Sequence, residues 1–498
     1  MPAPDLRSAR TRALRRRDPR LLALALLLPL AAPATGAEAA TDQATTPASV
    51  APPSGPYALE TVLGPSLDGP GDTSDVQVRF GDAVAIEGDW MLVGVPERRG
   101  AGGQVRGAAF IFRRDAAGEW ETHQFLQFGT GGDARCGAAV ALSGRHAVIG
   151  CPGFSSEGLA ERGRTLVYYR NDAGLYVDPV TFLGSQAGAR CGHAVAAASW
   201  IAVGCIGQNT TGQSPARGEV ELFVQPELPP PFNPQLWINP GRLVYDANVV
   251  PGPAPFQMGF ALAIDRLDGV DRIAVGIPGT VNNSGMVRVF RRNPGDGLNW
   301  AFEYASSLPG GPQTDARFGE AVALRGRLLT VGAPGADGRG RVHSFHLSPL
   351  SGTWAATGTI EPGTQPQHID SRFGTALAYS GSELWIGQPR WLDTGFSRRG
   401  RVLRYRGECS TVPCIPSYVF VDARTYTDAS MLAGAGFGRA LATDAGSGTL
   451  IAGAPLLGYS PPFGPEGVFS RRWGAVFSYR ADRLFANGFG SASASVAD

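Results

Sequence analysis

A short motif recurs seven times along this chain, and a repeat of this kind constrains the fold more than any other feature of the sequence. In one clear copy, residues 318–334, the motif reads FGEAVALRGRLLTVGAP. It opens with Phe-Gly, alternates small and branched apolar residues around an Arg-Gly turn, and closes with Gly-Ala-Pro. Such alternation around a short turn predicts a β-hairpin. The opening glycines of the seven copies stand at positions 81, 137, 192, 259, 319, 374 and 438.

Successive copies begin 55 to 67 residues apart, which is long enough for one four-stranded sheet with its loops. The sequence therefore predicts an all-β chain that forms one seven-bladed β-propeller of four-stranded blades. Each hairpin is followed by a third strand, such as residues 340–345, and by a fourth, such as residues 354–360. After the last hairpin, residues 474–479 form a third strand, but no fourth strand follows. We expect the opening segment Tyr57–Leu63 to supply this missing outer strand and to close the ring.

The two ends of the motif, Phe-Gly and Gly-Ala-Pro, resemble the FG-GAP repeat of the integrin α-subunit head. The resemblance covers nearly all of the chain after residue 57, and it implies the same propeller fold. Because integrin heads use their propeller to bind partners, the resemblance also implies a role in binding or cell adhesion.

The N-terminus has the pattern of a secretory signal peptide. Arginines between residues 10 and 17 precede the apolar run Leu21–Leu30, and Ala37-Glu38-Ala39 offers a small-residue cleavage site. The apolar run is short for a transmembrane helix, which needs about 20 apolar residues. We expect a soluble protein, periplasmic or extracellular, without a transmembrane segment. The predicted division is a signal peptide over 1–39, a disordered leader over 40–56, the propeller over 57–480 and a flexible tail over 481–498.

The charges of the chain are balanced, with 44 Lys+Arg against 43 Asp+Glu, and every one of these cations is an arginine. A chain with so little net charge has no strong electrostatic field that would attract nucleic acid, so we expect no nucleic-acid partner. The absence of lysine excludes Schiff-base chemistry on a lysine side chain.

No familiar catalytic motif interrupts the repeats. The chain has no GxSxG, no HExxH and no phosphate-binding glycine loop followed by lysine. Asp-Xaa-Arg precedes three of the hairpins, at Asp133, Asp315 and Asp370, and we interpret it as a turn and inter-blade ion-pair device because it repeats with the blade. We therefore expect a non-catalytic protein without a cofactor. The alternatives are a polysaccharide-active lyase or hydrolase on a propeller scaffold, and a passive part of an envelope complex.

Integrin-like repeats often carry a calcium loop between the first two strands, in which oxygen ligands alternate along the chain. Only the fourth blade offers candidates, namely Asp265, Asp268 and Asp271 beside Gly269. Their spacing departs from that loop. An Asp-rich hairpin turn without metal is therefore the favoured interpretation, with calcium as the alternative.

The six cysteines are an even number in a chain with an export signal, which favours disulfides. A two-residue turn at Ser143-Gly144 places Cys136 opposite Cys151. The third blade has cysteines at the two corresponding positions, Cys191 and Cys205. Cysteine replaces the ordinary residues at both facing positions or at neither, as a bond requires. We predict the disulfides Cys136–Cys151, Cys191–Cys205 and, across the loop CSTVPC, Cys409–Cys414.

Loops that join second to third strands all leave the ring at one end. They are long in blades two, three, six and seven and short in blades four and five. Since blade seven adjoins blade one, the long loops form an arc that mixes arginines, which can bind anions as forks, with aromatic side chains. The alternative is a solvated charged rim. We expect a protein or glycan partner to bind at Arg98, Arg99, Trp391, Arg398, Arg399, Tyr459, Phe463, Arg471, Arg472 and Trp473.

Overall fold

The computed structural model describes twelve segments of the chain, all within the compact unit Val50–Asp498. They are residues 57–64, 77–100, 103–129, 132–209, 217–226, 236–245, 256–292, 298–393, 397–409, 416–425, 434–459 and 471–481. The predicted signal peptide and leader lie outside these segments. So does the predicted tail, except for Ala481, at which the last strand ends.

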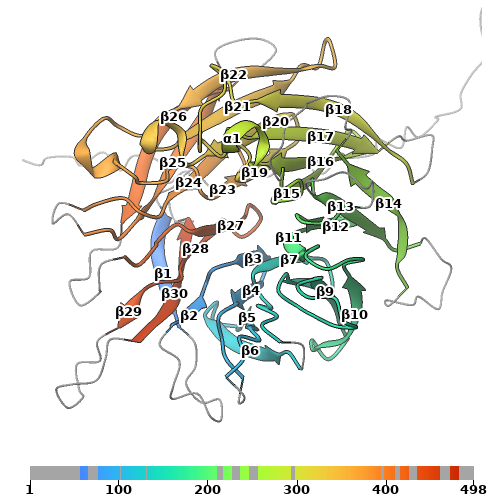
Figure 1. The fold of residues 1–498 in the computed structure, drawn as a ribbon. Helices are drawn as coiled ribbons and strands as arrows, with labels where there is room; N and C mark the ends of the chain where they lie inside the picture. The colour runs from blue at the N-terminus through green and yellow to red at the C-terminus, as the bar shows by residue number, and fades with distance from the viewer. Residues whose placement is uncertain are drawn as a thin grey trace, which may run out of the picture. The chain divides into compact units, whose positions relative to one another are not determined.

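The described residues form seven sheets, in which the four strands of each blade pair antiparallel (Figure 1). The prediction of an all-β, seven-bladed propeller of four-stranded blades is confirmed. From the inner to the outer strand, blade one is β3 (Val84–Glu87), β4 (Trp90–Val95), β5 (Ala108–Arg114) and β6 (Trp120–Gln127). Blade two is β7 (Ala139–Ser143), β8 (His146–Cys151), β9 (Arg164–Arg170) and β10 (Tyr176–Leu183). Blade three is β11 (Cys191–Ala197), β12 (Trp200–Cys205), β13 (Glu219–Val224) and β14 (Ile238–Val244).

The next three blades repeat this order. Blade four is β15 (Ala261–Leu267), β16 (Val270–Ile277), β17 (Met286–Arg292) and β18 (Trp300–Ser307). Blade five is β19 (Ala321–Arg325), β20 (Leu328–Ala333), β21 (Arg341–Leu347) and β22 (Trp354–Ile360). Blade six is β23 (Leu377–Ser380), β24 (Glu383–Gln388), β25 (Arg401–Cys409) and β26 (Pro416–Thr425). Helical structure in the described segments is limited to the short turns α1 (Thr280–Asn283), η1 (Ala336–Gly338) and η2 (Pro366–His368).

Blade seven combines both ends of the described chain. Its inner strands are β27 (Ala440–Asp444) and β28 (Thr449–Ala454), its third strand is β30 (Arg471–Ala481), and its outer strand is β1 (Tyr57–Leu63). β1 pairs antiparallel with β30, from Tyr57 opposite Ala481 to Leu63 opposite Val476. The short strands β2 (Gln77–Phe80) and β29 (Gly458–Tyr459) also pair with β30. The inner strands β3, β7, β11, β15, β19, β23 and β27 contact one another in sequence, and β27 contacts β3.

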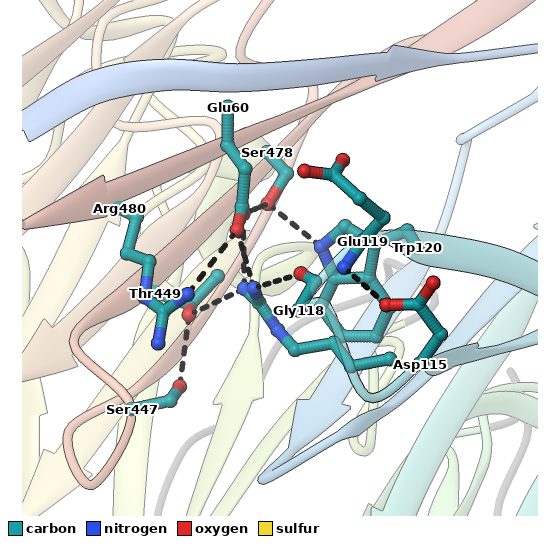
Figure 2. A network of polar contacts seen from close by, with 10 residues as sticks. Glu60, Asp115, Gly118, Glu119, Trp120, Ser447, Thr449, Ser478 and Arg480 are labelled. Atoms are coloured by element: carbon teal, nitrogen blue, oxygen red, sulfur yellow. Dashed lines mark hydrogen bonds and ion pairs between the residues drawn. The ribbon is translucent and has the colours of Figure 1, made fainter.

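A buried polar network joins β1 to blade one (Figure 2). Glu60 of β1 accepts hydrogen bonds from both terminal nitrogens of Arg114 in β5, and one of these distances is 2.9 Å. Ser478 of β30 donates to Glu60 at 2.7 Å and accepts from the indole nitrogen of Trp120 at 3.1 Å. Burial raises the pKa of Glu60, but these hydrogen bonds outweigh burial and hold the pKa below its ordinary value. The network therefore connects β1 both to β30 of blade seven and to blade one.

The recurring glycines explain why the motif repeats at each blade. A Cβ added at Gly453, the glycine of the last Gly-Ala-Pro, would lie 2.0 Å from the carbonyl oxygen of Gly81, which opens blade one. Gly81 itself has a φ of +84°, which favours glycine. The same approach, at 1.9 to 2.1 Å, recurs between consecutive blades at Gly94, Gly150, Gly204, Gly276, Gly332 and Gly387. The two ends of the motif thus meet across every blade junction.

The motif phenylalanines and cysteines fill the space between blades. Phe318 and Phe373 are fully buried, as are Cys136 and Cys151. The predicted disulfides Cys136–Cys151 and Cys191–Cys205 are confirmed. The predicted bond Cys409–Cys414 lies outside the described side chains and stays a prediction. In the described part of the chain, no helix has the length and apolar content needed to cross a bilayer.

Candidate functional site

The residue just before each motif has a left-handed backbone, and in six of the seven blades it starts a tight turn. In blade one, the amide of Asp82 donates to the carbonyl oxygen of Arg79 at 3.2 Å, and Arg79 has a φ of +58°. The turn brings its first and fourth side chains together, so that Arg79 and Asp82 form an ion pair at 2.7 Å. A left-handed backbone costs a non-glycine residue about 1–2 kcal/mol. The same left-handed conformation recurs at the corresponding non-glycine residue of six blades.

Arginine occupies this turn position in five of the seven blades. Gly107, which directly precedes β5 of blade one, bridges Cys136, the residue after Arg135 of the next blade. The turns therefore lie at the end of the propeller from which the second-to-third-strand loops emerge. Their first residues, all with positive φ, are Arg79, Arg135, Arg190, Gln257, Arg317, Arg372 and Gly436.

A cavity of about 510 Å³ opens at this end between blades six, seven and one. We call it the arginine cleft. Pro389, Pro455 and Leu456 supply part of its wall. Its other lining residues include five arginines from three blades: Arg79 of blade one, Arg372, Arg390 and Arg398 of blade six, and Arg439 of blade seven.

Internal carboxylates hold four of these five guanidinium groups. Asp370 lies 3.1 Å from Arg390 and 2.7 Å from Arg398. Burial raises the pKa of Asp370, but the hydrogen bonds and charges of these two arginines hold the pKa below its ordinary value. Asp82 lies 2.7 Å from Arg79 and 3.8 Å from Arg439.

The fifth guanidinium, that of Arg372, has no ion-pair or hydrogen-bond partner among the described residues, and its side chain is half-buried. One further carboxylate, Glu97, lies 3.9 Å from Arg79. Among the described residues, five arginines thus face three carboxylates, of which Glu97 also lies 3.9 Å from Arg135 outside the cleft, so the cleft has an excess of positive charge. Guanidinium groups bind carboxylate, sulfate or phosphate through paired hydrogen bonds.

The residues predicted from the long loops divide into two groups. Among those with described side chains, only Arg398 lines the cleft. Arg399 pairs with Asp393 at 2.9 Å, and half-buried Trp391 lies beneath the guanidinium of Arg401 at 4.8 Å. The side chains of Tyr459, Phe463, Arg471, Arg472 and Trp473 lie outside the described part of the structure.

The two predicted arginines of blade one bind neighbouring groups. The guanidinium of Arg98 lies 4.4 Å from the ring centre of Phe125, and Arg99 donates to the carbonyl oxygen of Gly103 at 2.8 Å. Neither lines the arginine cleft.

Sequence reasoning missed Arg79, Arg372, Arg390 and Arg439 as site residues. A signal existed, because Arg79 and Arg372 stand directly before a Phe-Gly pair. Arg372 also belongs to the Asp-Xaa-Arg motif, and the recurrence of that motif with the blade favours a structural interpretation.

The aspartates of the Asp-Xaa-Arg motif bond to other partners than their own arginines. Asp133 accepts from the backbone amide of Val105 and Asp315 from the side chain of Asn283, both at 2.8 Å and both across a blade junction. Asp370 instead pairs within blade six. The predicted turn and inter-blade ion-pair device is therefore only partly present: the first two aspartates bond across a blade junction, but to amide groups and not to arginines.

The calcium candidates do not converge. Asp265 accepts from the backbone amide of Gly326, and Asp268 pairs with Arg327 at 2.9 Å. Asp271 pairs with Arg292 at 2.8 Å. Within the described segments, no group of three or more His, Cys, Asp or Glu side chains could hold a metal ion. Their hairpin turn at Gly269 instead has the positive φ that glycine favours, +77°.

A second cavity, of about 680 Å³, lies among the inner strands β11, β15, β19 and β23. Alanine, valine and leucine side chains make up much of its lining, with one cation, Arg325, and one anion, Asp265. Its charge is balanced, in contrast to the arginine cleft.

Comparison with known proteins identifies no family. No family model matches the chain, and no curated protein matches it, so the similarity to the FG-GAP repeat stays a prediction. Among solved structures, the chain is similar to the Pseudomonas aeruginosa periplasmic gluconolactonase PpgL, with 17% identity and a TM-score of 0.43, over 74% of this chain and 94% of that one. It is also similar to Saccharomyces cerevisiae Sqt1, with 10% identity and a TM-score of 0.44, over 83% of this chain and 88% of that one.

Proposed function

We propose that this chain is an exported, non-catalytic binding module of the FG-GAP, integrin α-like type, which binds an anionic group of a protein or glycan through its second-to-third-loop face. The observation that carries the proposal is the convergence of five arginines from three blades on one cavity. Guanidinium groups are fixed, permanently charged donors, suited to holding an anion and unsuited to exchanging protons with it.

The protonation state of Asp370, the carboxylate that two arginines of the cleft share, also favours binding over catalysis. A glycoside hydrolase usually needs one carboxylic acid that stays protonated to donate a proton to the leaving group. The pKa of Asp370 is instead held below its ordinary value by Arg390 and Arg398, after the opposing effect of burial. This carboxyl group is therefore ionised at neutral pH and cannot serve as that acid.

Export rests on two further observations. The N-terminal sequence has the pattern of a signal peptide, and two hairpins carry disulfides. Disulfides persist mainly in oxidising compartments such as the periplasm and the extracellular space.

The test measures binding of the full mature chain to immobilised polyanions and to neutral polymers of matched length. We expect saturable binding to at least one polyanion, weakening as salt is raised, because salt screens partly exposed charges. The bound polymer should be recovered at its original length. A shortened or unsaturated product would establish the lyase or hydrolase alternative instead, and equal binding to neutral polymers would contradict an anion site.

A further inference from the structure

We propose that the anionic partner is an acidic polysaccharide, whose carboxylate groups bind in the arginine cleft with Arg372 as their first contact. This inference rests on the proposed function and narrows it to one class of ligand. It centres the site on Arg372, which stands directly before the repeat motif, and of the residues predicted from the long loops it includes Arg398.

The shape and lining of the cleft favour a saccharide over a protein surface. Protein interfaces bury about 800 Å² per partner, and aromatic side chains as well as arginines anchor their centres. No aromatic side chain is among the described residues that line the arginine cleft. The arginine cleft is a concave cavity of about 510 Å³ whose lining is half arginine. That volume lies within the range of about 300–1,000 Å³ that is typical of small-ligand sites, so it suits one or two charged sugar units.

The cleft already holds carboxylates of the chain itself. Asp370 lies between Arg390 and Arg398, and Asp82 lies between Arg79 and Arg439. These contacts show that pairs of guanidinium groups on this wall can hold a carboxylate between them.

Arg372 is the cleft arginine that has no such internal carboxylate within the described part of the chain. It lines the same cavity as the two clamped pairs, so a ligand carboxylate at Arg372 lies in the field of all five cations. Asp82 and Asp370 keep the flanking guanidinium groups in place before the ligand arrives. A polymer with a carboxylate on each sugar can present one group to Arg372 and leave its neighbours near the flanking pairs.

The experiment compares two matched variants of the full mature chain. Arg372→Asn removes the proposed contact, and Arg135→Asn removes the equivalent arginine of blade two, which does not line the cleft. Both arginines have positive φ, +55° and +52°, a conformation in which asparagine is enriched, so neither substitution adds backbone strain. Thermal denaturation confirms that both variants are folded. The probes are polygalacturonate, its methyl-esterified neutral form, polyglutamate and dextran sulfate.

We expect polygalacturonate to bind the wild-type chain, the methyl ester not to bind, and Arg372→Asn to weaken binding about tenfold or more, as for loss of a charged hydrogen bond. Arg135→Asn should change the affinity less than twofold.

If only polyglutamate binds, and Arg372→Asn abolishes it, the saccharide is overturned while the anion-binding function stands. If only dextran sulfate binds, and Arg372→Asn abolishes it, the carboxylate is overturned in favour of sulfate, and the anion-binding function again stands. If no polyanion binds, or if Arg372→Asn and Arg135→Asn weaken binding equally, both the saccharide inference and the cleft are overturned.

Discussion

Replacing Glu60 by glutamine tests how much the contact between β1 and Arg114 stabilises the junction of blade seven with blade one. The side chains of Glu60 and Arg114 are 13% and 4% exposed, so the pair is buried. Glutamine keeps the size of the side chain and one accepting oxygen, but it leaves Arg114 without its buried counter-charge. The substitution therefore acts on the junction of β1, β30 and blade one (Figure 2).

Breaking a buried ion pair by removing one partner costs about 3–5 kcal/mol of unfolding free energy. Because glutamine can still accept a hydrogen bond, we expect a loss near the lower end, about 3 kcal/mol. The unfolding entropy of roughly 425 residues is about 0.9 kcal/mol per kelvin, so the melting temperature should fall by about 3 °C.

Hydrogen exchange resolves where this stability is lost. In Glu60→Gln, amides of β1 and β30 should exchange faster than in the wild-type chain, while those of blades three to five should not. The matched control is Glu303→Gln, which breaks the similarly buried pair Arg272–Glu303 within blade four. Unchanged exchange in β1, or equally fast exchange there in both variants, would refute the role of Glu60 at this junction.

The same pair gives a pH dependence with a defined sign. Since the pKa of Glu60 is lowered in the folded chain, the pair contributes its full stability above the ordinary glutamate pKa of about 4.3. That contribution is lost as the pH falls through the lowered value. The difference in stability between wild type and Glu60→Gln should therefore shrink on acidification below about pH 4.3. A difference that grows in acid would contradict this assignment.

Two further substitutions test the blade junctions and the disulfides. Gly453→Ala places a methyl group 2.0 Å from the carbonyl oxygen of Gly81 and should lower the unfolding free energy by about 3 kcal/mol, whereas Gly129→Ala, with no atom within 4 Å, should change it by less than about 0.5 kcal/mol. Equal melting temperatures of these two variants would contradict the close junction. Replacing both Cys136 and Cys151 by alanine should cost about 3 kcal/mol in chemical denaturation, as for a closed loop of 15 residues, and an unchanged midpoint would contradict a stabilising bond.

Much of the fold could be predicted from the sequence because each of the seven motif copies indicates one blade. The sequence predicts the strand Tyr57–Leu63 by elimination, since the last blade lacks a fourth strand, and in the structure β1 spans those residues and pairs with β30. The pairing of Cys136 with Cys151 followed from the two-residue turn between their strands. The first inference uses the regular number of strands in each repeat, and the second uses local spacing, both of which can be read from a repeating sequence.

The candidate site could be predicted only in part, because it is assembled from residues far apart in the chain. Arg79 and Arg439 meet through the contact of blade seven with blade one, and a sequence pattern does not show which side chains reach the same cavity. The long loops drew attention to Arg398, which does line the cleft. Arg372 could not be predicted as a binding residue, because its position in a repeating turn favours a structural role.

Chemical labelling of arginines tests most directly whether the arginine cleft is the binding site. Phenylglyoxal would be applied to the full mature chain with and without saturating polygalacturonate, and the modified residues would be quantified by mass spectrometry. We predict that the ligand protects Arg372 by about tenfold or more, as for a directly bound charged group, and leaves Arg135 and Arg325 unchanged. Equal labelling of Arg372 with and without bound ligand, or protection of Arg325 instead, would contradict the arginine cleft as the binding site.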